Sequence, residues 1–351
     1  MGRTNAWTSQ VNWHTGRWQP RGPAPGPQPW SPPLRRGILA KRPLTFFEVL
    51  DSGFRLLRFA PGPAIGAPLI VLSLWTLLLT AVGAGLALTF LPFLRDLMGN
   101  DEALSGFSLL AQLGSFVLSL LSLGLVHFLA GLTVPAAEAS FGARRMGLAE
   151  SWRALRGRRW RLVLAAGLIT GIDLGLLLVL LVPATLLSLA EATVPAVVVG
   201  VLSLLLWVCA VVWVNLRLAL VGTAIGAEGL RVPAAVARSW RLTGRGLWRL
   251  LGQLGLGYVL SNQLIQLILS PFLLVLTTLA VIGLAAAEGD VAVMTAIGIV
   301  VGAVVLALTT ISSAVLFGYF SCLVCACYFD ARMRGEGYDL VLIRGEEERS
   351  A

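Results

Sequence analysis

The chain has 351 residues, of which 57% are hydrophobic and only 13% are charged, and its mean hydropathy is +0.82. This composition excludes a water-soluble globular domain, in which about 25% of residues are charged. The net charge of +9 would suit nucleic-acid binding in a soluble protein. Because the arginines here lie beside apolar segments, we instead expect a membrane surface with anionic lipid headgroups as the partner, and no nucleic acid.

The N-terminal segment, residues 1–43, contains a proline-rich stretch at 19–33 and no apolar core of the kind found in signal peptides. Proline removes a backbone donor and restricts φ, so we predict a disordered, Pro/Trp-rich cytoplasmic tail over 1–43. A recruitment motif is an alternative function for this tail. At the other end, residues 336–351 are predicted to form an acidic cytoplasmic tail.

Between these tails lie six apolar segments, each long enough to cross a bilayer, which takes about 20 residues. Five have no charged residue, and the sixth has only Asp173; they cover 59–94, 103–137, 162–190, 192–216, 250–287 and 291–329. The sequence therefore predicts an all-α polytopic integral membrane protein, with a six-helix membrane domain over 44–335. Since a second span in any segment would invert all later loops, we interpret the longest segments as long helices that project beyond the hydrocarbon.

The basic residues alternate between the connections. Nine precede the first segment, and further groups of seven, six and four lie in 138–161, in 217–249 and after 330. The first connection has only Arg95, beside acidic residues, and the third and fifth have none, so 26 of the 27 lie on one side. Lys and Arg are retained on the cytoplasmic side during insertion. We predict a multi-pass protein of the bacterial cytoplasmic membrane with both termini inside.

A threefold repeat accompanies this topology. Ser151-Trp152-Arg153 and Trp160-Arg161-Leu162 return 88 residues later as Ser239-Trp240-Arg241 and Trp248-Arg249-Leu250. A looser copy, with Phe54-Arg55, precedes the first segment. Each repeat is predicted to contain an amphipathic interfacial helix followed by two spans.

In the predicted interfacial helices, charged residues recur at helical spacing on one face and apolar residues on another. In the third repeat the arginines form one stripe and the apolar residues another: Arg238, Arg241, Arg245 and Arg249 against Val236, Trp240, Leu247 and Leu251. In the first repeat Phe47, Leu50, Phe54 and Leu57 share the predicted apolar face, and Thr45 with Glu48 has capping-box spacing.

We predict that six residues of these helices contact lipid: Trp152, Arg153, Trp160, Trp240, Arg241 and Trp248. Anionic-lipid binding that couples the membrane to the bundle is one interpretation. A topology anchor at the headgroup boundary explains the same pattern, and we favour it.

Polar residues within the spans form a second candidate site. Asp173 is predicted to lie about 16 Å from the inner boundary, where a carboxylate needs a partner or a proton. Four other polar residues fall near the same depth: His127, Arg217, Asn215 and Asn262. We hypothesise a midplane cluster centred on an Asp173–Arg217 pair, with His127 as the alternative partner and a snorkelling Arg217 as a further possibility. The cluster would form a substrate or proton pathway, or, as we favour, a buried pair that sets helix register.

Other patterns indicate packing. Glycines recur every four residues at Gly167, Gly171 and Gly175, at Gly222 and Gly226, and at Gly298 and Gly302. This spacing predicts close helix approach.

Cys322, Cys325 and Cys327 could supply three thiolates, but they lie in an apolar run, so we interpret them as packing residues rather than metal ligands or lipidation sites. No hydrolase, metalloprotease or nucleotide-binding motif is present, and we expect no cofactor and no enzymatic activity.

Three segments resemble the glycerophosphoryl diester phosphodiesterase membrane-domain family. They are Pro43-Leu44-Thr45-Phe46-Phe47-Glu48-Val49-Leu50-Asp51, Arg238-Ser239-Trp240-Arg241-Leu242-Thr243 with Trp248, and the run from Tyr328-Phe329-Asp330 to Tyr338-Asp339-Leu340. In some members this membrane module is fused to a soluble catalytic barrel, which has no counterpart here. The resemblance therefore implies the membrane module without its catalytic residues.

Together these observations predict a non-catalytic membrane scaffold or accessory module. The alternative is a small transporter or lipid-handling protein that uses the midplane polar cluster.

Overall fold

The computed structural model describes residues 37–89 and 123–350, and these residues form helices without a strand. Six helices are long and apolar enough to cross a membrane: Gly62–Gly85, Gly124–Phe141, Arg159–Leu189, Val194–Glu228, Leu247–Ala286 and Ala292–Glu336. The prediction of an all-α polytopic membrane protein with six spans is confirmed. The predicted tail over 1–36 and the first connection, with Arg95, Asp96, Asp101 and Glu102, lie outside the described residues.

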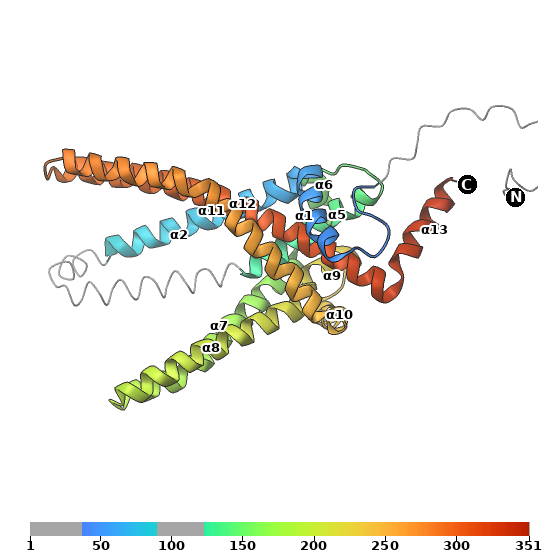
Figure 1. Cartoon of the computed structure of the whole chain (residues 1–351), viewed down its shortest axis with the longest axis horizontal. Coiled ribbons are helices and arrows are strands. Elements are labelled where there is room, and N and C mark those ends of the chain that lie inside the picture. The colour runs from blue at the N-terminus through green and yellow to red at the C-terminus, as the bar shows by residue number, and fades with distance from the viewer. Residues whose placement is uncertain (1–36, 90–122, 351) are drawn as a thin grey trace, which may run out of the picture. The chain divides into compact units, whose positions relative to one another are not determined.

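The helices follow the threefold repeat (Figure 1). The first repeat contains α1 (Phe46–Phe59), the π-helical turn η1 (Gly62–Gly66), α2 (Ala67–Thr89) and α5 (Leu123–Phe141). The second contains α6 (Leu148–Ala154), α7 (Arg159–Leu189), α8 (Thr193–Leu218) and α9 (Val221–Glu228). The third contains α10 (Val232–Gly244), α11 (Leu247–Ala286) and α12 (Val291–Glu336), and α13 (Tyr338–Ser350) follows it.

Helix α1 begins at Phe46, directly after the predicted capping box. The Glu48 N–H donates to the Thr45 hydroxyl, and the Thr45 N–H donates to the Glu48 carboxylate, so both unpaired amides are satisfied. The Thr45 N–H and then Arg42 lower the pKa of Glu48 to about 2.

The buried face of α1 is rotated from the one that the sequence predicts. It comprises Val49, Leu50, Ser52, Gly53, Leu56 and Phe59. Phe47, which the spacing assigned to this face, is exposed, while Leu50 is buried as predicted. The reason is that α12 packs on α1 at Gly53, where a Cβ would lie only 3.0 Å from the Tyr319 ring.

The core lies where α5, α9 and the C-terminal part of α12 pack together, and we call this packed region the base. Helix α5 packs against both α9 and α12, and 72% of its most apolar stretch is buried, against none in α11 and α12. From this base the hairpins α7–α8 and α11–α12 extend as pairs of helices (Figure 1). Their apolar side chains are largely exposed in the isolated chain, as expected of surfaces that face lipid.

The last two spans are far longer than a bilayer requires. Helices α11 and α12 contain 40 and 46 residues. They are therefore about 60 Å and 69 Å long, roughly twice the thickness of the hydrocarbon core. This excess length allows the C-terminal part of α12 to pack in the base while the rest of the helix forms a span.

Glycine permits the closest contact in the base. A Cβ at Gly222 of α9 would lie 1.8 Å from the main-chain oxygen of His127 on α5, and one at Gly226 would lie 2.6 Å from that of Gly131. The predicted close approach is thus present for this pair. The other predicted glycines show no such approach, since no described atom beyond the helix's own backbone lies within 4 Å of a Cβ at Gly167, Gly171, Gly175, Gly298 or Gly302.

The predicted tail boundary at residue 43 needs correction. Residues 37–43 are ordered: the Ile38 N–H donates to the Ser140 oxygen at 3.0 Å, and Leu39 is buried in the main core. The apolar side chains in this short segment give it a binding surface on α5, which composition alone does not reveal.

Replacing Gly222 with alanine should destabilise the base, because the new methyl group meets backbone that cannot move aside. We expect a loss on the order of 3 kcal/mol, measured by thermal unfolding in detergent. Gly171→Ala is the matched control and should leave stability unchanged or raised by up to about 1 kcal/mol through helix propensity. Equal melting temperatures for the two variants would contradict the described α5–α9 contact.

Candidate functional site

Asp173 and Asn215 join the two helices of the second hairpin within the membrane. The Asn215 amide donates to both Asp173 carboxylate oxygens, at 2.9 and 3.1 Å, and also to the Val211 oxygen at 3.0 Å. The Trp207 ring N–H donates to the main-chain oxygen of Asp173 at 3.3 Å. Asp173 is only 1% exposed. The pair therefore links α7 to α8 through a buried carboxylate and a partly buried amide.

The predicted Asp173–Arg217 ion pair is wrong, because no such pair forms in the described chain. The Arg217 guanidinium instead lies over the rings of Trp240, at 5.0 Å, and Trp213, at 5.7 Å. Arg217 follows Asn215 by two residues, which turns it about 200° around the helix, away from Asp173. The tryptophans receive the cation where α8 enters the base.

The other two residues of the predicted midplane cluster, His127 and Asn262, lie in different surroundings. His127 on α5 is buried beside the Asn215 side chain and the Ala219 main chain, and its Nδ1 has no partner. Asn262 on α11 forms no hydrogen bond with another described residue, since its helix packs mainly against α12. The structure thus brings together Asp173, Asn215 and His127, and leaves Arg217 and Asn262 out.

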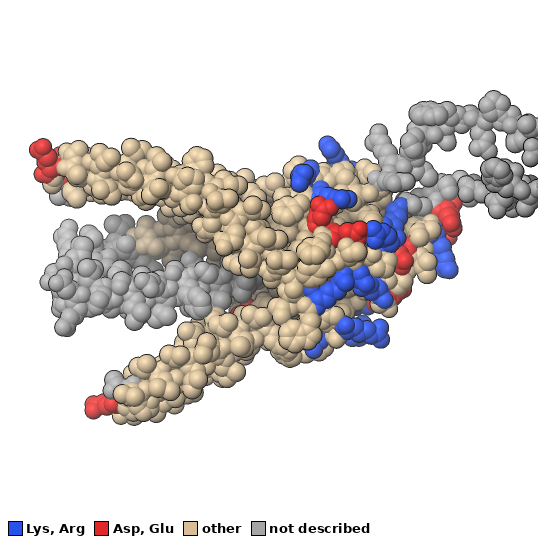
Figure 2. Space-filling model, in the orientation of Figure 1, with Lys and Arg blue, Asp and Glu red and all other residues tan. Residues whose placement is uncertain are grey.

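The six predicted lipid-contacting residues are all exposed. The basic residues gather at one end of the molecule, and the far ends of the apolar hairpins are acidic (Figure 2). Trp160 and Trp248, at the starts of α7 and α11, are 78% and 82% exposed. The Arg159 guanidinium lies 4.2 Å from the centre of the Trp152 ring. We call these six residues, Trp152, Arg153, Trp160, Trp240, Arg241 and Trp248, the collar.

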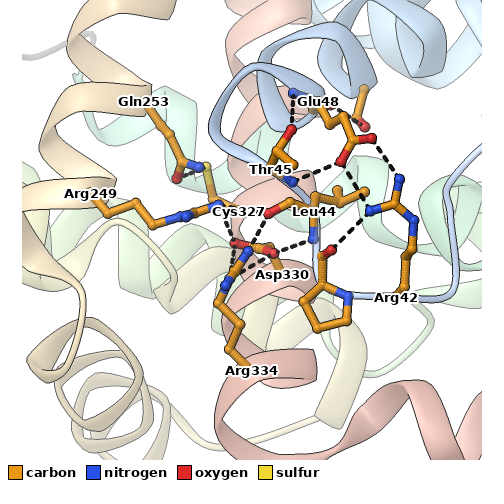
Figure 3. Close-up of polar contacts among 11 residues, drawn as sticks. Arg42, Leu44, Thr45, Glu48, Arg249, Gln253, Cys327, Asp330 and Arg334 are labelled. Atoms are coloured by element: carbon orange, nitrogen blue, oxygen red, sulfur yellow. Dashed lines mark hydrogen bonds and ion pairs between the residues drawn. The ribbon is translucent and has the colours of Figure 1, made fainter.

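A buried charged site joins the first repeat to the third (Figure 3). The Leu44 N–H donates to the Asp330 carboxylate at 2.8 Å, and the Leu44 oxygen accepts from Arg249 at 2.7 Å and from Arg334. Arg334 also donates to both Asp330 oxygens, and Arg249 lies 3.5 Å from the carboxylate. We call these four residues the Leu44 clamp. Asp330 is buried, so the clamp holds a full carboxylate away from water.

An equivalent contact joins the second repeat to the third. Arg161, in the first turn of α7, donates to the Gly229 oxygen just before α10 at 2.6 Å. Arg249 lies 88 positions later, in the first turn of α11, and donates to the Leu44 oxygen just before α1. Arg161 therefore fixes the chain at the entry to α10, and Arg249 fixes it at the entry to α1.

A second charged network surrounds Glu228 at the end of α9. Its carboxylate accepts from Arg238 of α10, at 2.8 Å, and from the Tyr328 hydroxyl of α12, at 2.7 Å. Arg238 also pairs with Glu336, which lies 3.3 Å from Arg332. Hydrogen bonds from Arg238 to Glu336 and Glu228 raise its pKa further. Repeats two and three are thus joined by ion pairs as well as by backbone contacts.

The three clustered cysteines are buried among apolar side chains. The Cys325 thiol donates to the Ala130 oxygen, and the Cys327 thiol lies 3.7 Å from the Gln253 side-chain oxygen. Among the described residues, no group of three His, Cys, Asp or Glu side chains is placed to hold a metal ion.

The chain matches no protein-family model, no curated protein and no solved structure. The site must therefore be interpreted from its own geometry.

The residues that form most of the contacts between repeats are not among the predicted site residues: Asp330, Glu228, Tyr328, Glu336 and Arg334. One signal was available, since an acidic residue stands at the C-terminal end of the second apolar segment in each repeat, as Glu138, Glu228 and Asp330. The partner of Asp330, Leu44, lies 286 positions away, and that of Glu228, Tyr328, lies 100 positions away, so no local spacing reveals these pairs.

Asp330→Asn should destabilise the protein by about 3 kcal/mol, because it leaves Arg334 and Arg249 without their buried carboxylate. Thermal unfolding in detergent measures the change. Asp51→Asn is the control: Asp51 pairs with Arg55 four residues away, but both side chains are more than half exposed. It should cost less than about 1 kcal/mol. Similar losses in the two variants would contradict the structural role of the clamp.

The Asp173–Asn215 link can be measured with a double-mutant cycle. Asp173→Ala and Asn215→Ala should show a coupling energy of about 1 kcal/mol, typical of a hydrogen bond between membrane helices. Asp173→Ala combined with Asn262→Ala should be additive, since no contact joins those residues. Coupling in the second cycle, or none in the first, would argue against the described arrangement.

Proposed function

We propose that the protein is a non-catalytic scaffold or accessory module of the bacterial cytoplasmic membrane, with both termini and the charged base on the cytoplasmic side. The observation that carries this proposal is α13, which follows the last span and presents Leu340, Val341 and Ile343 to the surroundings. An exposed apolar surface outside the six spans is suited to contact with another protein. The described base offers no arrangement of nucleophile and base for catalysis.

The collar supports the second part of the proposal, which is contact with anionic lipid headgroups. Tryptophan is favoured at the boundary between headgroups and acyl chains, and arginine beside it interacts with lipid phosphates. With the base inside the cell, the basic residues lie at the leaflet that is rich in anionic lipid.

The proposal includes the architecture implied by the resemblance to the glycerophosphoryl diester phosphodiesterase membrane domain, namely a membrane module that serves a separate process. A transporter is less well supported, because Asp173 is sealed by its contacts with Asn215 and Trp207. A pathway through the bundle would need this carboxylate to be accessible.

Photo-cross-linking in living cells tests the scaffold function. A photoreactive residue in place of Val341 should trap a discrete protein partner, whereas one at Val275 of α11 should trap lipid. The two side chains are similarly exposed, at 60% and 59%, so they form a matched pair. Lipid adducts alone at both positions would contradict a scaffold.

Labelling of intact spheroplasts with an impermeant maleimide checks the orientation: Glu191→Cys should react and Arg344→Cys should not.

A further inference from the structure

A cavity of about 470 Å³ lies in the base between α10, the start of α11 and the end of α12. This volume falls within the range of small-molecule binding sites. The lining contains five arginines, Arg238, Arg241, Arg245, Arg249 and Arg334, but only two carboxylates, so it carries a surplus of three positive charges. We call it the arginine cavity.

The two carboxylates in the lining are already neutralised. Asp330 is held by Arg334 and Arg249, and Glu336 pairs with Arg238 and Arg332. Arg241 and Arg245, in contrast, form no ion pair with any described carboxylate. The positive charge of these two side chains is therefore available to a ligand.

Two buried donors in the same lining also lack acceptors. Gln253 is only 2% exposed, yet its side-chain N–H₂ has no hydrogen-bond partner, and neither has the Nε–H of Arg249. The two residues lie one turn apart on α11 and point toward Cys327 and Asp330 on α12 (Figure 3). Buried donors without acceptors are rare and costly in native proteins. A bound group rich in acceptor oxygens would satisfy both.

We propose that the arginine cavity binds a phosphate group. A phosphate supplies several acceptor oxygens and negative charge together, which matches two free guanidinium groups and two unmet N–H donors. The phosphate could belong to an anionic phospholipid headgroup or to a soluble phosphate compound. This inference rests on the proposed function in one respect only, which is the position of the cavity at the level of the cytoplasmic headgroups.

Binding is tested on the full chain in detergent, by thermal unfolding and calorimetry at constant ionic strength. The probes are inorganic phosphate, short-chain phosphatidylglycerol and, as the neutral comparison, short-chain phosphatidylcholine. We expect saturable stabilisation by the first two, in excess of any effect of phosphatidylcholine. Tighter binding of phosphatidylglycerol identifies a lipid headgroup as the source, and tighter binding of inorganic phosphate identifies a soluble compound. No saturable shift with either anion would overturn the proposal.

Arg241→Gln combined with Arg245→Gln should weaken binding by at least about tenfold, because two charge-assisted contacts are lost. Arg145→Gln combined with Arg156→Gln is the matched control, since it removes the same charge from exposed positions outside both the cavity and the collar. This control pair should bind phosphate like the unmodified chain.

Gln253→Leu provides an independent test of the unmet donor. It should leave the ligand-free protein at least as stable, since it removes a buried N–H₂ group without an acceptor at the cost of only a weak contact from the Cys327 thiol. It should also weaken phosphate binding by about tenfold. A variant that binds phosphate normally would contradict the assignment of Gln253.

The tests separate this inference from the proposed function. Equal weakening by both arginine pairs would show diffuse attraction to anions, which overturns the cavity but leaves headgroup contact by the collar intact. Conversely, specific phosphate binding without a protein cross-link at Val341 would contradict the scaffold function and support phosphate binding in the arginine cavity.

Discussion

The Leu44 clamp is the contact that joins the two ends of the described chain. It holds the main-chain N–H and C=O of Leu44 between the Asp330 carboxylate and two arginines, so that the entry to α1 is fixed to the C-terminal part of α12 across 286 positions. A buried carboxylate is tolerated only when its partners are all present, which makes the arrangement specific as well as stabilising. Because the second and third repeats are joined in a similar way at Gly229, the three hairpins share one base.

The fold separates two physical tasks. The hairpins α7–α8 and α11–α12 satisfy their backbone hydrogen bonds internally and expose apolar side chains, which is what a bilayer requires. The base contains nearly all of the charged contacts, together with the close glycine packing between α9 and α5. The collar marks the boundary between these regions, and α13 and the arginine cavity lie on the charged side. The proposed functions consequently belong to the base rather than to the midplane.

Features that depend on local composition are predictable from the sequence. The six spans, the start of α1 at its capping box and the close approach at Gly222 all follow from short stretches of sequence, and the structure contains them. Helical spacing also placed four arginines of the third repeat on one lipid-facing stripe. Two of them instead turn inward, Arg238 to Glu228 and Arg249 to Leu44, because carboxylates and carbonyls from other repeats lie within reach.

The sequence by itself determined the number of spans and the alternation of charge along the chain, since hydrocarbon thickness and the placement of arginine act on each segment separately. Only the tertiary structure decided which polar groups meet. Asp173 pairs with Asn215 and not with Arg217, because two positions along α8 turn a side chain to the opposite face of the helix. The unmet donors of Gln253 and Arg249 likewise became visible only when α10, α11 and α12 were packed around a common cavity.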